Sequence, residues 1–357
     1  MIYLDNASAM PPAPETADFF RTSVLEDFVN QESLHHAAYL QRQKLLHSAG
    51  ELCAALSPEG SFTRLIWGNS ATELIMLAGR FLSGCRVLSS PLEHPAVTAA
   101  LTETKTTLFP VPPSGKLSPD ALPEVTPEAI FLHHVQSETG IIQDIAAFKR
   151  RFPAAMVIAD CAQSGGKMAL PPVDAAIVSG VKFGAPGGAA LLLSPTAVKG
   201  TELIKFAASL RERHRLSRIA PPLLHSMAFA AKLTCRYRDA ALEKARNLQQ
   251  KLLELTAAYG IKPLLPPSTE LSPYITPLFL PGYQAAVVVR TLSQSGIHCS
   301  SGSACAAESD TPSAALLALG VRKKAAFSLL RVSFNFTTTE NEVIFFASEL
   351  KKVLKNY

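Results

Sequence analysis

The chain has 357 residues, of which 48% are hydrophobic and 18% are charged, a composition typical of one or two ordinary globular domains with a large core. The formal net charge of +5 is spread along the chain, and the densest basic run, residues 211–218, is too short to indicate nucleic-acid binding. No apolar run approaches the ~18 residues of a membrane-spanning helix, so we expect neither a nucleic acid nor a membrane as a partner.

The N-terminus, MIYLDNASAMPP, lacks the basic and then apolar pattern of a signal peptide. The cysteines form no CxxC pair and show no His/Cys spacing typical of zinc, which predicts free thiols, a reducing cytoplasm and no metal site. They are Cys53, Cys85, Cys161, Cys235, Cys299 and Cys305.

Short apolar runs alternate with helical stretches along the first part of the chain. The expected strands are RLIWGNS (64–70), CRVLSS (85–90), AIFLHHV (129–135), AAMVIAD (154–160), DAAIVSG (174–180) and GAALLLS (188–194). ATELIMLAGRFL (71–82) follows the first of them as a helix, and PLEHPAVTAAL (91–101) follows the second as a loop and helix. Continuous apolar runs indicate strands that are covered on both faces, so we expect an α/β fold with a mostly parallel sheet flanked by helices.

The pattern changes in the last third of the chain. One long helical stretch is expected from Pro222 to Tyr259, and a proline-rich segment, residues 262–273, comes after it. The runs AAVVVRTLSQSG (285–296), LLRVSFNF (329–336) and NEVIFFASELKKVLKNY (341–357) predict a smaller α+β unit. We place the boundary inside the long helix, so that residues 12–235 form the large domain and residues 1–11 and 236–357 form the small one.

Several stretches place chemically useful residues at the ends of expected strands, where α/β sheets bind ligands. The turn GNSATE (68–73) opens a helix and suits a phosphate, although the same residues also make an ordinary helix cap. Asp160 ends a buried strand and needs a positive partner or a capping role, and Lys182 follows another buried strand, where a lysine of lowered pKa can form a Schiff base. Together with His94, these residues favour a pyridoxal 5'-phosphate site.

The sequence resembles the cysteine desulfurases, which are class-V, fold-type-I pyridoxal-phosphate enzymes. IYLDNAS is similar to the family's YLDNAAT, NSATE to SGATE, LEHPAV to EHPSV, HHVQSETG to HVNNETG, SGVKFGAPGG to SGHKFGGPKG, and SSGSAC to the family's cysteine loop. The matches follow the family order from the first strand to the last helix. The resemblance implies an α/β fold with a second small α+β domain, pyridoxal phosphate as cofactor, a homodimer, and conversion of L-cysteine to L-alanine.

The resemblance assigns roles around the cofactor ring. Lys182 would form the Schiff base, Asp160 would pair with the pyridinium nitrogen, and Gln163 would hydrogen-bond the ring hydroxyl. His94 would stack on the ring and relay protons.

Further roles concern the phosphate and the substrate. Ala71, Thr72 and Ser179 would hold the phosphate, and Arg331 would clamp the substrate carboxylate. Cys305 would take the sulfur as a persulfide, on a small-residue loop that lets the thiol travel to the substrate and then to a sulfur-acceptor or scaffold protein, as in iron–sulfur cluster assembly.

The chain departs from the family pattern near the cofactor. Val181 stands where the family has a phosphate-binding histidine, and Ser137 replaces a longer asparagine near the substrate. Arg218 stands where the family has a threonine that reaches the phosphate of the neighbouring subunit, and its charge suits the same role. These departures affect cofactor anchoring more than the chemistry.

Three functions are compatible with these residues. The first is an active cysteine desulfurase, which the motif loop around Cys305 favours. The second is another class-V enzyme, a selenocysteine lyase or an aminotransferase, with a changed substrate. The third is a non-catalytic paralogue acting as a binding partner, which the changes at Val181 and Ser137 favour and the presence of Lys182 and Arg331 opposes. The sequence does not name the sulfur acceptor.

Overall fold

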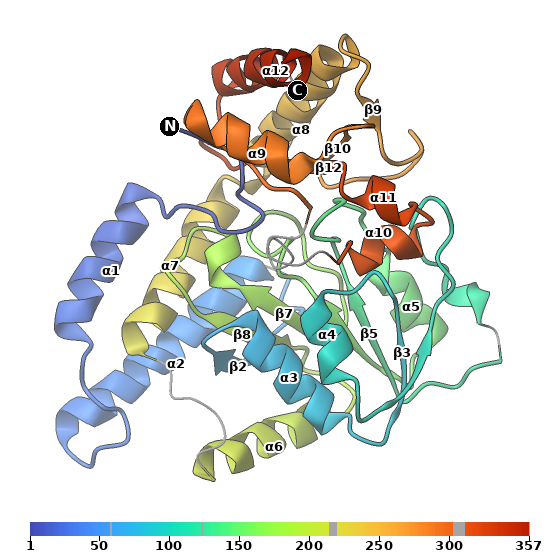
Figure 1. The fold of residues 1–357 in the computed structure, drawn as a ribbon. Coiled ribbons are helices and arrows are strands. Elements are labelled where there is room, and N and C mark those ends of the chain that lie inside the picture. The colour runs from blue at the N-terminus through green and yellow to red at the C-terminus, as the bar shows by residue number, and fades with distance from the viewer. Residues whose placement is uncertain (58, 123, 214–219, 303–310, 357) are drawn as a thin grey trace.

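A seven-stranded sheet forms the centre of the larger part of the molecule (Figure 1). The structure is a computed structural model that describes residues 1–57, 59–122, 124–213, 220–302 and 311–356. In spatial order the strands are β2 (Arg64–Gly68), β8 (Ala189–Leu193), β7 (Ala175–Ser179), β6 (Met156–Asp160), β5 (Ala129–His133), β3 (Arg86–Ser89) and β4 (Lys105–Leu108). Of these strands β8 alone runs antiparallel to its neighbours, so the predicted mostly parallel α/β sheet is confirmed.

Helices cover both faces of this sheet because its strands are apolar on both sides. Within β5, Ile130 and Leu132 belong to one core cluster while Ala129 and Phe131 belong to the other, as the two-residue period of a strand requires. One face packs against α2 (His36–Leu56), α5 (Ile145–Arg151) and α7 (Pro221–Arg236), and the other packs against α3 (Ala71–Phe81), α4 (Pro95–Ala100) and α6 (Gly200–Glu212).

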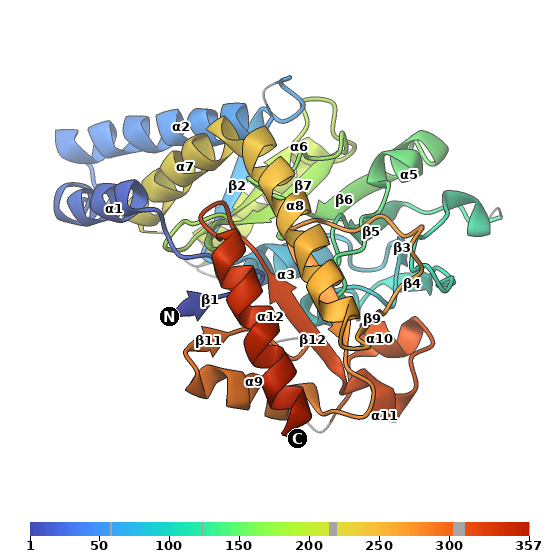
Figure 2. The ribbon, with the colours of Figure 1, turned by 90° about the horizontal axis from the view of Figure 1, so that it is seen from above.

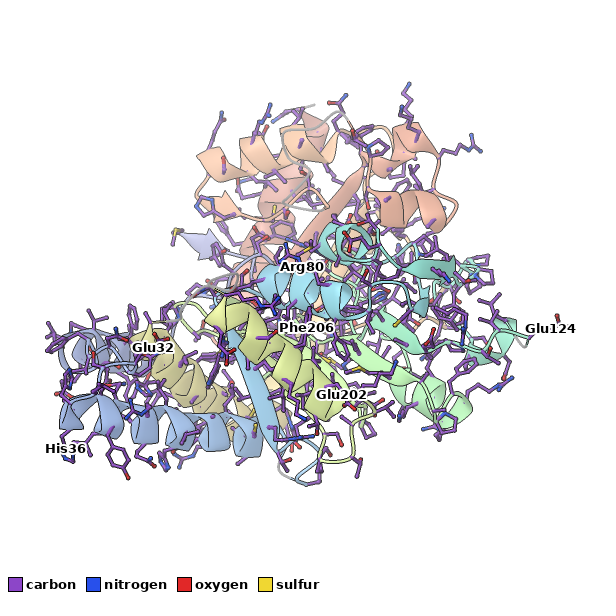
Figure 3. All side chains as sticks on the ribbon, turned by 90° about the horizontal axis from the view of Figure 1, so that it is seen from below. Glu32, His36, Arg80, Glu124, Glu202 and Phe206 are labelled. Carbon is purple, nitrogen blue, oxygen red and sulfur yellow. The ribbon has the colours of Figure 1, made fainter. Side chains whose placement is uncertain are left out.

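The N-terminal helices form an arm beside the sheet. Helix α1 (Pro14–Glu26) and helix α2 both pack against α7, and the three lie side by side in Figures 1 and 2. Figure 3 shows Glu32 and His36 at the far end of this arm, while Arg80 on α3 and Phe206 on α6 lie over the sheet.

A smaller α+β part with its own core lies on one side of the sheet, at the top of Figure 1. Its strands are β1 (Ile2–Tyr3), β9 (Lys262–Pro263), β10 (Ile275–Phe279), β11 (Ile297–His298) and β12 (Leu329–Ser333). Its helices are α8 (Arg238–Ala257), α9 (Ala285–Gln294), α10 (Ala314–Ala318), α11 (Lys323–Ala326) and α12 (Glu340–Lys355). Strand β10 lies between β12 and β9, and β1 pairs with β11, so the first residues of the chain join its last third.

The prediction of one continuous helix from Pro222 to Tyr259 is wrong. Two helices, α7 and α8, occupy this stretch, and they meet at Tyr237, whose φ of −108° and ψ of 9° are not helical. Helix α7 packs on α1 and α2, whereas α8 packs on α12. The chain bends at Tyr237 because its two halves are held by different parts of the molecule.

Two short 3₁₀ turns complete the description: η1 (Pro119–Ala121) and η2 (Gly180–Lys182). In the described part of the chain, no helix has the length and apolarity needed to cross a membrane.

Candidate active site

The N-terminal segment Asp5–Ser8 is the centre of the candidate site. It leaves β1 and passes beside β12, with the backbone of Asp5 bridged to that of Ser333. Its backbone and side-chain atoms contact three of the predicted site residues: Lys182, Gln163 and Arg331. Residues far apart in the sequence therefore meet around one short segment.

Lys182 lies on η2, directly after β7, as predicted. Its ammonium Nζ donates a hydrogen bond to the carbonyl oxygen of Ser8, and its side chain is half-buried. The carbonyl of the preceding residue, Val181, accepts from the backbone N–H of Met10 at 2.8 Å. The N-terminal segment thus fixes both the lysine and the turn that carries it.

Asp160 ends β6 and is 8% exposed. Its Oδ1 accepts from the backbone N–H of Ala162 at 3.0 Å, and no cationic side chain of the described residues forms an ion pair with it. A buried carboxylate is stable only with a positive partner or several donors. Asp160 is therefore suited to a protonated ring nitrogen, as the resemblance implies.

Gln163 begins the turn that follows β6. Its Nε2 donates to the carbonyl of Ala7 at 2.9 Å, whereas its Oε1 is buried and has no hydrogen-bond partner among the described residues. A buried acceptor without a donor is destabilising, so this atom has room for one hydroxyl group. These two observations, at Asp160 and at Gln163, show that the residues present fit a pyridoxal ring.

His94 is the N-cap residue of α4. Its Nδ1 accepts from the backbone N–H of Ala96 at 3.1 Å, so the neutral ring carries its proton on Nε2. In this geometry Nε2–H is a donor, and the ring accepts a further proton only if the cap bond breaks. The neighbouring Glu93 turns inward to His133, with 2.7 Å between its Oε1 and the histidine Nδ1, and burial raises the pKa of Glu93.

The proposed phosphate cup lies at the start of α3. The Oγ of the N-cap residue Ser70 accepts from the backbone N–H of Glu73, and Ala71 and Thr72 form the first turn of the helix. The helix dipole and free backbone N–H groups at this end suit an anion. Ser179, at the end of β7, is buried beside η2.

Arg211, the first residue of the basic run 211–218, is a cation near this end of the sheet. It lies on α6 and donates from Nη2 to the carbonyl of Trp67, near the end of β2. Burial lowers its pKa, and the charge of Glu73 opposes that shift. Only the packing of α6 against α3 reveals its position, because α6 is distant in sequence from the turn it approaches.

Arg331 lies in the middle of β12 and is 3% exposed. Its Nη2 donates to Asp5 Oδ1 at 2.8 Å and to Ser8 Oγ at 2.7 Å, and its Nη1 donates to the carbonyl of Ser137 at 2.9 Å. A guanidinium has five N–H donors, so the described residues leave two of them unused, and among these residues the buried Nε has no partner. Arg331 is thus held rigidly and retains the capacity to bind a carboxylate.

Ser137 contacts the site through its backbone, by the bond just described. The roles predicted for Arg218 and Cys305 fall on residues outside the described part of the chain. The segment that leads to Cys305 is described as far as Gly302. Ser300 exchanges backbone hydrogen bonds of 3.1 and 2.7 Å with Arg331, so the cysteine loop starts beside the predicted substrate clamp.

Cys299 lies in the core, a few residues before the cysteine loop. It follows β11, is 7% exposed and packs in the core of the smaller part. Burial raises the pKa of its thiol to about 12, which leaves almost no thiolate at neutral pH.

Sequence comparison agrees with this geometry. The family described as aminotransferase class-V matches residues 2–346. The chain belongs to the class-V aminotransferase family. It is similar to a cysteine desulfurase IscS of Acinetobacter baumannii, with 27% identity over 96% of this chain and 90% of the relative.

Solved structures share the fold along the whole chain. A NifS-like protein from Rickettsia africae superposes with a TM-score of 0.85 at 20% identity, covering 99% of both chains. A second NifS-like protein has a TM-score of 0.82 at 20% identity and covers both chains completely. The resemblance to cysteine desulfurases is confirmed, and class-V aminotransferases use pyridoxal phosphate.

Proposed function

We propose that this class-V enzyme is a pyridoxal-phosphate-dependent cysteine desulfurase that converts L-cysteine to L-alanine and passes the sulfur to Cys305. The observation that carries the proposal is the meeting of Lys182, Gln163 and Arg331 on residues 5–8, with the start of the cysteine loop paired to Arg331. An aminotransferase has no use for the travelling thiol that the SSGSAC motif predicts.

The chain supplies a holder for each part of the cofactor. Lys182 would attach it, Asp160 would keep its ring nitrogen protonated, and Gln163 would accept from its ring hydroxyl. The first turn of α3 and Ser179 would bind the phosphate. When bound, pyridoxal phosphate withdraws electrons from the substrate and weakens the bonds at its Cα and Cβ atoms.

The substrate is oriented by Arg331. One of its remaining N–H donors would bind the carboxylate of cysteine, while Asp5 and Ser8 keep the guanidinium plane in place. The amine of Lys182 would then move the proton of the substrate Cα. Because Arg331 and Lys182 contact the same residue, Ser8, binding and proton transfer are positioned by one segment.

The sulfur step needs the thiolate of Cys305. This thiolate attacks the substrate sulfur, the bond between that sulfur and Cβ breaks, and its electron pair stays on carbon. Cβ takes up a proton and alanine results, while Cys305 holds the sulfur as a persulfide. The Nε2–H of His94 would donate a hydrogen bond to this thiolate, and the proton relay that the resemblance implies for this residue stays a prediction.

The test is to incubate the holoenzyme with L-cysteine and to measure alanine and protein-bound persulfide. We expect both products in wild type and neither in Cys305→Ala, which should keep the colour of the bound cofactor. Equal rates in wild type and Cys305→Ala would favour a lyase or an aminotransferase. Selenocysteine and 2-oxo acids tested as substrates separate these two, and a protein that takes up no pyridoxal phosphate would be a non-catalytic paralogue.

We also propose that the enzyme is a homodimer. Large apolar side chains lie exposed on the α1–α2 arm, which projects from the sheet in Figure 2. They are Leu25, Phe28, Leu34, Leu40 and Leu46. A patch of this kind indicates an interface, and the family geometry would bring the partner's arginine at position 218 to the phosphate. Phe28→Asp should convert the dimer to a monomer in analytical ultracentrifugation, and an unchanged sedimentation coefficient would exclude the arm as the interface.

The persulfide must pass to an acceptor, and we propose a thiol-bearing protein in a reducing cytoplasm, as in iron–sulfur cluster assembly. The cysteines within the described ranges are all free thiols, which supports such a compartment. Incubation with a thiol acceptor should increase alanine release by regenerating Cys305, and an unchanged rate would argue against transfer.

A further inference from the structure

A cavity of about 150 Å³ lies between the two parts of the molecule, where α7 meets α8. Its wall is mostly apolar and includes Met10, Ala13, Leu233, Ala241 and Phe336. An apolar cavity of this volume holds one benzene-sized molecule. The predicted cofactor and substrate residues do not line it, so it is separate from the site described above.

Lys167 contributes the unusual polar group of this wall. The residue as a whole exposes 6% of its surface. Among the described residues nothing forms an ion pair or a hydrogen bond with its Nζ, which lies 5.9 Å from the centre of the Tyr274 ring. A buried ammonium without a counter-charge is costly, so this position is suited to an anion.

The backbone fixes Lys167 in this position. The preceding residue, Gly166, has a φ of +72°, and an added Cβ would lie 2.8 Å from Phe183. Only glycine meets both requirements without strain, so the turn that carries Lys167 depends on a glycine at position 166. Burial lowers the pKa of Lys167 to about 7, with the positive charges of Lys182 and Arg331 adding to the shift.

We propose that this cavity binds a small monocarboxylate with an apolar body the size of a benzene ring, whose carboxylate pairs with Lys167. The apolar wall binds the body, and Lys167 selects the negative charge. Phosphate or sulfate would lose its hydration shell against apolar side chains without gaining enough donors. Amines would meet a like charge.

The other polar groups of the wall are compatible with this ligand. Arg238 adds positive charge and already pairs with Asp239 at 3.4 Å, and Glu15 is exposed to solvent. The pKa of Tyr274 is raised above its usual value by burial, so its hydroxyl stays neutral, and Tyr237 is exposed. Lys167 is therefore the group whose protonation responds to the ligand between pH 7 and 9.

The test is calorimetric titration of the holoenzyme with benzoate at pH 8, in two buffers of different ionisation enthalpy. We expect benzoate to bind with uptake of nearly one proton, because the carboxylate raises the pKa of Lys167 above the pH. Lys167→Met keeps the hydrocarbon volume and should bind benzoate at least tenfold more weakly, without proton uptake. Lys232→Met, which changes an exposed lysine of α7, is the matched control and should bind like wild type.

Two further variants keep the result decisive. Ala241→Phe should fill the cavity and abolish binding while leaving Lys167 in place. Arg331→Gln should retain binding, because Arg331 belongs to the proposed substrate clamp. The proposal is wrong if benzoate does not bind wild type, if it binds Lys167→Met equally well, or if Arg331→Gln alone loses it. None of these outcomes depends on whether the enzyme desulfurates cysteine.

Discussion

Replacing Lys167 by methionine should remove a pH dependence from the stability of this protein. In the folded state burial lowers the pKa of Lys167 to about 7, from an unperturbed value of 10.5. At about 1.4 kcal/mol for each pKa unit, a fully charged Lys167 destabilises the folded state by about 5 kcal/mol relative to the neutral form. Because the residue exposes only 6% of its surface, solvent screens little of this free energy.

The sign follows from proton binding. Between pH 10.5 and about 7 the unfolded chain holds a proton on Lys167 that the folded protein lacks. Unfolding therefore takes up a proton, and the free energy of unfolding falls as the pH falls through this range. Below about pH 7 both states are protonated and the dependence ends. From pH 9 to pH 7, we expect the free energy of unfolding of wild type to fall by about 2 kcal/mol relative to that of Lys167→Met.

The assay is urea denaturation of both proteins, with Lys232→Met as a control, at pH 7, 8 and 9. Other titrating groups act equally in all three proteins, so the difference between wild type and Lys167→Met isolates Lys167. A difference in free energy of unfolding between wild type and Lys167→Met that stays constant across this pH range would refute the reasoning. It would mean that Lys167 has the same pKa in the folded and unfolded states. The Lys232→Met control should follow wild type because that side chain is half-exposed and loses only a surface ion pair with Glu51.

Three predictions concern the active site. Cys299→Ala should retain desulfuration while Cys305→Ala releases no alanine, as measured by amino-acid analysis, because the Cys299 thiol is buried. Asp5→Ala removes the counter-charge of the buried Arg331, so the urea midpoint should fall by an amount equivalent to about 3 kcal/mol, and the KM for cysteine should rise. Gln163→Ala removes one acceptor from the cofactor and should weaken pyridoxal-phosphate binding about three- to tenfold in equilibrium dialysis.

Specific outcomes would contradict each of them. Loss of activity in Cys299→Ala would place its thiol on the transfer route. An unchanged KM in Asp5→Ala would show that Arg331 is oriented by other contacts. Unchanged cofactor affinity in Gln163→Ala would leave its buried Oε1 without a role.

The fold class and the residues of the proposed chemistry could be predicted from the sequence. Continuous apolar runs predicted a sheet covered on both faces, because a strand that is buried on both faces carries apolar side chains on both. Asp160 and Lys182 could be recognised because each is an ionisable residue at the end of such a run. The motif around Cys305 predicted a thiol on a flexible loop, which local sequence encodes through its small residues.

The contacts between these residues could not be predicted from the sequence and are visible only in the folded structure. The run GAALLLS is apolar in either direction, so it could not show that β8 runs antiparallel. Helical periodicity continues through Tyr237, and the bend arises only because α7 and α8 pack on different neighbours. The role of residues 5–8 and the burial of Lys167 depend on contacts across more than a hundred residues, which local pattern does not encode. Such contacts form only in the folded chain. For that reason the sequence predicted the residues of the site but not the segment, residues 5–8, that contacts them.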